Sequence, residues 1–302
     1  MYKLSGVTKN YQKGRSTVAA LRGVDLVIED GEWLAVQGPT GHGKSTLLQI
    51  LGGLDRPSSG IVEFDGRDLA QLRETEVTKV RAQSIGFVFQ TFNLVPTLSA
   101  LENVEAALVP LHVGSAARRQ RATMALEVVG LGDRLRHVPG ELSGGQQQRV
   151  AVARALVKEP KVLLADEPTG NLDEDTRDDI IGLLETMWRE RGLTMVLVTH
   201  DSSIARRAQR IGVMKNGRLG FKQPRPAQSR PGQPARVQAP HTGGSVSTGT
   251  PADLEASRPQ APDLAALEEA DLDSDLQGAD LDSELPDFDD PDSKPADTIT
   301  FD

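Results

Sequence analysis

Short runs of apolar residues recur along positions 1–221, and polar or amphipathic stretches separate them. Four of the runs are apolar at consecutive positions, a pattern that is typical of parallel strands buried on both faces. These four runs lie at residues 33–36, 85–89, 162–165 and 195–198. Stretches with helical character come between them. This alternation predicts an α/β domain with a mostly parallel central sheet.

The pattern changes near both ends of this region. Residues 23–28 alternate between apolar and polar side chains, as in an antiparallel strand that has one face in water. Near the other end, residues 215–218, which include Asn216 and Gly217, separate two short apolar runs at 211–214 and 219–221, which is a strong hairpin signal. We therefore expect an antiparallel strand close to the start of the domain and a β-hairpin at its end.

The middle of the region, about residues 91–155, is predicted to form a mostly helical lobe inserted between two strands. Ser99 and Glu102 fit a helix-capping box, and the apolar pattern after them runs to about Val113. Residues 118–129 form a second amphipathic pattern. No internal repeat is visible, so we expect a single folded domain over residues 1–221.

The remainder of the chain, residues 222–302, has a different composition. It carries eleven of the eighteen prolines, two aromatic residues, seventeen acidic residues and six basic ones, a balance of -11. Such a segment buries too little apolar surface to offset the entropy of ordering, which predicts a disordered, Pro-rich and acidic tail. Leucines recur among its acids, so two roles stay open: a solvated extension, or a segment that folds on a basic partner.

Composition excludes several classes of protein. Residues 1–221 have a formal charge of +2, which argues against a protein that binds nucleic acid through a large basic excess. The chain has no cysteine, which excludes disulfides, cysteine-ligated zinc and thiol catalysis. No apolar run approaches the roughly 20 residues of a membrane-spanning helix, and none of signal-peptide length opens the chain. We expect a soluble, intracellular protein whose membrane role, if any, depends on a partner.

The segment between the first buried run and the next helix fits the pattern G-x-x-x-x-G-K-[ST]. Its residues are Gly38, Pro39, Thr40, Gly41, His42, Gly43, Lys44, Ser45 and Thr46. Glycines allow backbone N–H groups to surround phosphates at the positive end of the following helix. In such a loop Lys44 reaches the β- and γ-phosphates and the Ser45 hydroxyl binds Mg²⁺. A plain glycine turn would not require a lysine and a serine at these positions.

Two acidic residues follow the third buried run. Asp166 stands at the end of a predicted strand, where a carboxylate faces the phosphate site and can hold Mg²⁺ directly or through water. Glu167, the next residue, is placed to accept a proton from an attacking water as general base. Strands often end in aspartate, so this pair carries weight only because it accompanies the phosphate loop.

A second glycine-rich segment opens a helix in the predicted lobe. It consists of Ser143, Gly144, Gly145 and Gln146. A helix N-terminus with exposed amides and a hydroxyl again suits a phosphate. One chain thus offers two phosphate-binding segments for one nucleotide, which favours a nucleotide shared with another subunit.

Residues 1–221 resemble the nucleotide-binding subunit of an ABC transporter, because Ser143–Gln146 match the signature that is specific to that family. The resemblance implies further roles. Tyr11, 27 residues before the phosphate loop, corresponds to the aromatic residue that stacks on adenine. Gln90 corresponds to the glutamine that touches Mg²⁺ and the nucleophilic water, residues 171–173 to the loop that couples two sites, and His200 to the histidine that contacts the γ-phosphate.

Each of these residues also has a simpler interpretation when taken alone. Tyr11 could pack on a β-sheet, Gln90 would carry no meaning, and His200 could be a surface histidine at the end of a strand. Their order and spacing favour the functional interpretation. His42 departs from the small residue often found at its position, and its side chain is expected to point outward and to take no catalytic part.

The resemblance implies a P-loop NTPase fold with a mostly parallel central sheet, an N-terminal antiparallel β-subdomain and an inserted helical lobe. It also implies an ATPase that uses ATP and Mg²⁺, forms an ATP-dependent homodimer, and drives a separate integral-membrane permease from the cytoplasmic face of the membrane, without nucleic acid. The loops at 93–98 and 169–173 resemble those of macrolide-export and lipoprotein-release ATPases. That branch includes cell-division ATPases of the FtsE type.

Two functions therefore stay open at this point. One is a motor for export or extrusion of a hydrophobic drug, peptide or lipoprotein. The other is a regulatory ATPase that activates cell-wall enzymes through a membrane partner and moves no solute. Soluble ABC ATPases of DNA repair or translation form a third class, but they usually carry two such domains or long coiled-coil insertions, and neither is visible here.

Overall fold

The computed structural model describes residues 1–14 and 16–221. The predicted disordered tail, residues 222–302, lies outside the described residues, so the division of the chain at residue 221 stays a prediction. Among the described residues, no helix combines the length and the apolar character that crossing a membrane requires.

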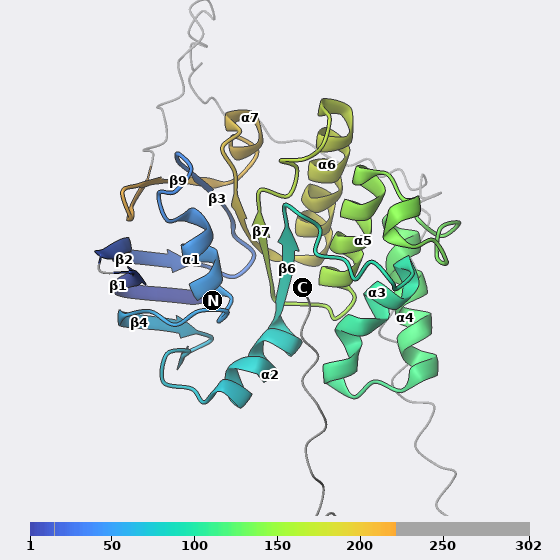
Figure 1. Ribbon diagram of the computed structural model, residues 1–302, viewed down its shortest axis with the longest axis horizontal. Coiled ribbons are helices and arrows are strands. Elements are labelled where there is room, and N and C mark those ends of the chain that lie inside the picture. The colour runs from blue at the N-terminus through green and yellow to red at the C-terminus, as the bar shows by residue number, and fades with distance from the viewer. Residues whose placement is uncertain (15, 222–302) are drawn as a thin grey trace, which may run out of the picture. The chain divides into compact units, whose positions relative to one another are not determined.

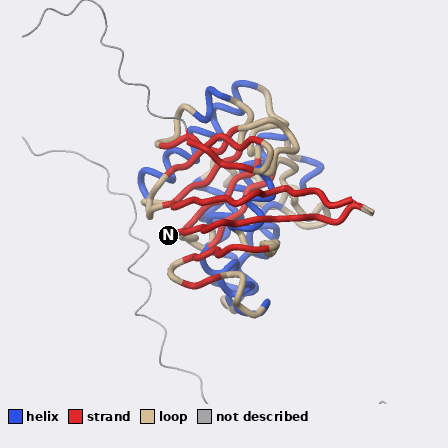
Figure 2. Tube along the Cα trace, turned by 90° about the vertical axis from the view of Figure 1, so that its left-hand side faces the viewer, coloured by secondary structure: helices blue, strands red, loops and turns tan. Residues whose placement is uncertain are grey.

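The N-terminal part of the chain forms an antiparallel sheet with the strand order β2-β1-β4-β5. Its strands are β1 (Tyr2–Lys13), β2 (Ser16–Ile28), β4 (Ser59–Phe64) and β5 (Arg67–Asp68). β1 lies between β2 and β4 and runs antiparallel to both. Figure 2 views this sheet from its outer side. The alternating pattern at 23–28 correctly predicted a strand with one buried face, since Val24, Leu26 and Ile28 are buried.

The central sheet has the strand order β10-β9-β3-β8-β7-β6. Its strands are β3 (Trp33–Gln37), β6 (Ile85–Phe89), β7 (Val162–Asp166), β8 (Thr194–Val198), β9 (Arg210–Lys215) and β10 (Arg218–Phe221). The five strands from β9 to β6 pair in parallel, and β10 pairs antiparallel with β9 through the predicted hairpin. The predicted α/β architecture is therefore confirmed.

The apolar runs are continuous because both faces of the central sheet are covered. On β7, Leu163 and Ala165 pack into one core cluster, whereas Val162 and Leu164 pack into the other. The first cluster lies under α3, α4, α5 and α6, and the second lies under α1 and the antiparallel sheet. Figure 1 shows these helices on the two sides of the central strands.

The helices between the strands have defined bounds. They are α1 (Lys44–Leu51), α2 (Glu74–Ser84), α3 (Ala100–Glu105), α4 (Ser115–Val128), α5 (Gly144–Leu156), α6 (Glu174–Arg191) and α7 (Ser202–Ala205), with 3₁₀ turns at η1 (Ala106–Leu111) and η2 (Pro139–Glu141). Between β6 and β7 the chain forms α3, η1, α4, η2 and α5. Of these, α5 contacts both β6 and the helices α3 and α4, so it links the lobe to the sheet.

The capping box before α3 forms as the sequence predicted. The backbone N–H of Ser99 donates to Glu102 Oε2 at 2.8 Å, and the N–H of Glu102 donates to Ser99 Oγ at 3.3 Å. The helix itself is shorter than the apolar pattern suggested, because the chain passes into the 3₁₀ turn η1, which contains Pro110. Proline lacks the N–H that would continue an α-helix.

Candidate active site

The phosphate-loop motif lies between β3 and α1, as its sequence context predicted. α1 begins at Lys44, and Gly43 before it adopts a φ of 100°, a conformation that disfavours residues with a Cβ. A Cβ on Gly43 would lie 2.4 Å from the carbonyl oxygen of Ala20, so the loop is pressed against β2. Glycine offers no side chain to cap α1, and the first amides of that helix are left for another acceptor.

Lys44 is buried and folds back over its own loop. Its Nζ donates to the carbonyl oxygens of Gly38 at 2.9 Å and Pro39 at 3.2 Å. Glu167 Oε1 lies 4.0 Å from the same ammonium group. The charge of Lys44 thus stands between the loop and the carboxylate at the end of β7.

Asp166 ends β7 beside the loop and retains an unsatisfied oxygen. Its Oδ1 is buried and accepts no hydrogen bond from the described residues. Burial raises the pKa of Asp166, and a hydrogen bond from the Ser45 hydroxyl opposes that effect. A buried carboxylate oxygen beside a hydroxyl is a donor set that suits Mg²⁺, which prefers oxygen ligands and keeps several waters.

A cation at this position would depend on few protein ligands. The described residues contain no cluster of three or more histidine, aspartate or glutamate side chains that could hold a metal ion. Mg²⁺ is commonly bound by one or two carboxylates together with phosphate oxygens and water, so the small donor set is compatible with Mg²⁺ bound with a nucleotide. Ser45 and Asp166 therefore fit such an ion.

Glu167 has an unusual backbone conformation. Its φ is 47°, in the left-handed region that L-residues with side chains rarely adopt. Its N–H donates to the carbonyl oxygen of Val198 in β8 at 2.9 Å, which holds the residue in this conformation. Strain of this kind costs roughly 1–3 kcal/mol and is often found at functional sites.

His200 and Glu167 are in direct contact. The Nδ1 of His200 lies 2.5 Å from Oε2 of Glu167, a hydrogen bond in which the ring N–H donates to the carboxylate. The histidine follows β8 and the glutamate follows β7, and these strands are parallel neighbours. The edge of the sheet thus brings together two residues that are 33 positions apart. Since 68% of the His200 side chain is exposed, its ring can still meet a ligand.

Gln90 follows β6, the next strand of the same edge. In the register of the sheet, Phe89 pairs with Asp166, so Gln90 lies beside the two carboxylates. Its side chain is held by Asn171, because Gln90 Nε2 donates to Asn171 Oδ1 at 3.4 Å and Asn171 Nδ2 donates to the carbonyl oxygen of Gln90 at 3.0 Å. Gly170 leaves room for this arrangement.

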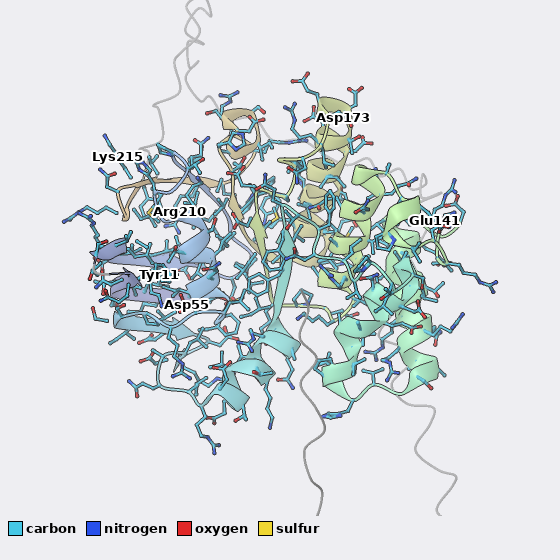
Figure 3. The ribbon with its side chains drawn as sticks, in the orientation of Figure 1. Tyr11, Asp55, Glu141, Asp173, Arg210 and Lys215 are labelled. Atoms are coloured by element: carbon cyan, nitrogen blue, oxygen red, sulfur yellow. The ribbon has the colours of Figure 1, made fainter. Side chains whose placement is uncertain are left out.

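Tyr11 lies near the end of β1 and contacts the phosphate loop and the turn after α1. Its hydroxyl donates to Asp55 Oδ2 at 2.7 Å, just beyond the end of α1, and it also lies within hydrogen-bond reach of Thr46. Figure 3 shows Tyr11 and Asp55 beside each other. Burial, followed by the hydrogen bond to Asp55, raises the pKa of the Tyr11 hydroxyl. The Lys9 ammonium group lies 4.9 Å from the centre of the ring.

The signature residues Ser143, Gly144, Gly145 and Gln146 form the start of α5. Ser143 caps the helix, since Gln146 N–H donates to its hydroxyl at 3.3 Å and Gln146 Oε1 accepts from the Ser143 N–H at 2.9 Å. The structure does not bring this segment to the phosphate loop. α1 packs into one core cluster and α5 into the other, on opposite sides of the central sheet.

The signature segment instead contacts the loop at 171–173 and the start of α6. A Cβ on Gly145 would lie 2.3 Å from Thr176 Cγ2, and one on Gly144 would lie 3.5 Å from Leu172 Cδ2. Asp173 caps α6 by accepting from Thr176 N–H at 3.0 Å. The same loop holds Gln90 through Asn171, so it links the signature helix to the edge of the sheet.

Sequence reasoning missed Asp55 and the pairing of Asn171 with Gln90. Asp55 is 44 residues from Tyr11, and Asn171 is 81 residues from Gln90. Neither residue belongs to a periodic pattern or a charged cluster. The one available signal was a nearby glycine in the same loop, since Gly53 lies two residues before Asp55 and Gly170 directly precedes Asn171.

Comparison with known proteins agrees with this geometry. Residues 21–170 match the protein-family model described as ABC transporter. The chain is 47% identical over 222 residues to the lipoprotein-releasing system ATP-binding protein LolD of Geobacter metallireducens, covering 72% of this chain and 97% of that protein. It is 46% identical over 240 residues to a macrolide export ATP-binding/permease protein MacB of Paracoccus denitrificans, covering 80% of this chain and 35% of that protein.

A solved structure shows the same fold. The structure of the ATP-binding cassette MJ0796 of Methanocaldococcus jannaschii, a dimer in a post-hydrolysis state bound to ADP and Pi, has a TM-score of 0.70 and 44% sequence identity. The match covers 75% of this chain and 100% of the MJ0796 chain.

Proposed function

This chain belongs to the ATP-binding subunits of ABC transporters, and from that premise we propose that the residues at the ends of β6, β7 and β8 hydrolyse ATP with Mg²⁺. The observation that carries this proposal is the contact between Glu167 and His200 beside Lys44. This contact supports a role for Glu167 as the base, for His200 as its orienting partner and for Lys44 as the cation that binds phosphate.

The phosphate loop, residues 38–46, would hold the phosphates of ATP. The N–H groups at the start of α1 point toward the loop and favour an anion there. Lys44 would leave the carbonyl oxygens of Gly38 and Pro39 and bind the β- and γ-phosphates, which offer stronger charge-assisted hydrogen bonds. Tyr11 would stack on adenine at the outer end of this loop.

Ser45, Asp166 and Gln90 are the residues that would hold Mg²⁺. The unsatisfied buried Oδ1 of Asp166 and its contact with Ser45 support this assignment. When bound, Mg²⁺ would neutralise the negative charge that develops on the phosphates. Gln90 reaches the same edge of the sheet from β6 and would contact both the ion and the attacking water.

The reaction would transfer the γ-phosphoryl group of ATP to water. Glu167 Oε accepts a proton from the water as its oxygen forms a bond to phosphorus, and the bond from phosphorus to the β–γ bridging oxygen breaks, so that ADP leaves. His200 holds the Glu167 carboxylate by its Nδ1–H and leaves its other ring nitrogen for the γ-phosphate. The left-handed φ of Glu167 fixes the carboxylate at this edge.

Completion of the site would require a second copy of the chain. Ser143, Gly144, Gly145 and Gln146 lie on the other side of the central sheet from α1, so they cannot complete the phosphate site of their own chain. The dimeric MJ0796 cassette with ADP and Pi supports a homodimer. Two ATP molecules would then bridge two copies, and hydrolysis would release the bridge and open the dimer.

The membrane partner would be a separate permease chain. The MacB relative is named an ATP-binding/permease protein, and this chain spans 35% of its length. The LolD relative is named an ATP-binding protein and is spanned over 97% of its length. We place the protein on the inner face of the cell membrane, with the helical lobe around 90–103 passing its motion to the permease. These relatives are named for export and release, and they do not favour the regulatory alternative.

The replacement Glu167→Gln tests the proposal. Loss of a general base should lower kcat by about 10²–10⁴-fold, while ATP binding persists because the phosphate loop is unchanged. The ATP-bound variant should accumulate as a dimer in size-exclusion chromatography. Glu190→Gln, on the exposed face of α6, is the matched control and should keep the wild-type rate. Wild-type ATPase activity in Glu167→Gln would reject Glu167 as the base.

A further inference from the structure

The side chain of His42 contacts a segment that lies far from it in the sequence. The N–H of Asn216 donates to His42 Nδ1 at 3.0 Å, and the N–H of Gly217 donates to the carbonyl oxygen of His42 at 3.1 Å. Both donors belong to the turn between β9 and β10, and Figure 3 labels Lys215 beside that turn. Two adjacent amides of the turn are thus bonded to a single residue of the phosphate loop.

The same turn is packed tightly against the loop and against β2. Gly217 accepts a hydrogen bond from the Arg22 N–H at 2.8 Å, and a Cβ on Gly217 would lie 2.7 Å from the carbonyl oxygen of Ala20. At the start of the loop, a Cβ on Gly38 would lie 2.2 Å from the carbonyl oxygen of Met214. The end of β9 and the turn after it therefore support the phosphate loop at two points.

In both of these hydrogen bonds His42 is the acceptor, so neither bond uses an N–H group of the phosphate loop. Nδ1 accepts from Asn216, so this ring nitrogen carries no proton in the bond, and the carbonyl oxygen accepts from Gly217. The carbonyl oxygens of Gly38 and Pro39 likewise accept from Lys44. A loop that binds an anion needs its N–H groups free and its carbonyl oxygens turned away, and these contacts produce that arrangement.

We propose that His42 is a positioning residue for ATP: its imidazole fixes the phosphate loop to the β9–β10 turn, so that the loop is curved for phosphate before nucleotide binds. This inference rests on the proposed role of the loop in binding ATP. The imidazole supplies a contact that the small residue often found at this position cannot make. Without it the loop samples other conformations, and the apparent affinity falls in proportion to the fraction that stays competent.

This role predicts a specific kinetic signature. His42→Ala should raise the Kd and KM for ATP by about three- to tenfold, the range that corresponds to one hydrogen bond. Bound ATP itself holds the loop, so kcat at saturating ATP should stay within about twofold of wild type. His42→Asn should restore most of the affinity, because its Oδ1 lies close to the position of Nδ1 and accepts the same hydrogen bond.

The experiment uses the full chain and measures ATP affinity by titration calorimetry together with steady-state ATPase kinetics. Gln49→Ala, an exposed position of α1, is the matched control and should keep the wild-type KM. Hydrogen exchange of the segment 214–218, followed by mass spectrometry, provides a second readout. Exchange there should be faster in nucleotide-free His42→Ala than in wild type, and ATP should reduce the difference.

Three outcomes in the ATP titrations and kinetics would overturn the inference. These are an unchanged KM in His42→Ala, a loss of kcat without a change in KM, and a His42→Asn variant as weak as His42→Ala. Unchanged exchange at 214–218 would equally reject the contact as the cause. Failure of the proposed function is separate, since in that case the wild-type chain itself would show no Mg²⁺-dependent ATPase activity.

Discussion

Replacing Tyr11 with alanine should weaken the binding of ATP by about 5- to 150-fold. The side chain is 37% exposed, so its ring is available to a nucleotide base, and its hydroxyl is fixed by a 2.7 Å hydrogen bond to Asp55. Thr46, within hydrogen-bond reach of the same hydroxyl, places the ring next to the phosphate loop. A base in contact with the ring would therefore lie close to the phosphate loop.

The size of the effect follows from two separable contributions. Stacking of a base on an aromatic side chain is worth about 1–3 kcal/mol, and alanine removes all of it. Tyr11→Phe keeps the ring and removes the hydrogen bond to Asp55. An ordinary hydrogen bond contributes about 0.5–1.5 kcal/mol, so this variant should lose about 2- to 12-fold in affinity. The exposed position of the bond favours the lower part of that range.

Equilibrium titration with a fluorescent ATP analogue would measure the three dissociation constants. The expected order of affinity is wild type, then Tyr11→Phe, then Tyr11→Ala. Val18 pairs with Tyr11 across β1 and β2 and is 49% exposed, so Val18→Ala controls for loss of a side chain from this sheet. If Tyr11→Ala binds ATP within twofold of wild type, the stacking role is refuted and Tyr11 serves the packing of the sheet.

Two further predictions concern other parts of the domain. Burial and the nearby Arg81 lower the pKa of Lys158 from 10.5 to about 8. The folded chain therefore binds this proton less tightly than the unfolded chain. The free energy of unfolding should rise as pH increases from about 8 to about 10.5. Urea unfolding at about pH 7.5 and 9.5 should show a rise of about 1–2 kcal/mol that Lys158→Met lacks, and equal pH dependence in both proteins would contradict it. Gly170→Ala would place a Cβ 2.7 Å from Gln90 Nε2, so it should displace Gln90 and lower kcat with little change in melting temperature. Gly182→Ala, where a Cβ meets no atom within 4 Å, is its control, and an unchanged kcat in Gly170→Ala would argue against a role for the position of Gln90.

The sequence predicted most of the fold because its signals were local. β7 reads as a continuous apolar run since its alternate residues enter two different cores, and Ser99 with Glu102 marks the start of α3 directly. The length of that first helix was overestimated, because apolar periodicity does not distinguish an α-helix from the 3₁₀ turn around Pro110.

The order of the motifs was enough to predict the site residues. It was not enough to predict the contacts that these residues make. Nothing within the sequence pairs Tyr11 with Asp55, or Gln90 with Asn171, because each pair meets only when separate strands and loops have packed. His42 was expected to point outward, and its bond to Asn216, 174 residues away, depends on the hairpin lying beside the phosphate loop. Such contacts arise from tertiary packing and leave no periodic signal.

The order of strands in the central sheet determines when that sheet can form during synthesis of the chain. β3, which leads into the phosphate loop, pairs with β8 and β9, and those strands end at Val198 and Lys215. At about 5–20 residues per second, the ribosome needs roughly ten to forty seconds to add the chain between β3 and the end of β9. Early in that interval β4 and β5 are added and can pair with β1 to complete the antiparallel sheet, but β3 has neither of its neighbours until β8 is made. A nascent chain therefore cannot complete the sheet beside its phosphate loop until synthesis of the domain is nearly finished.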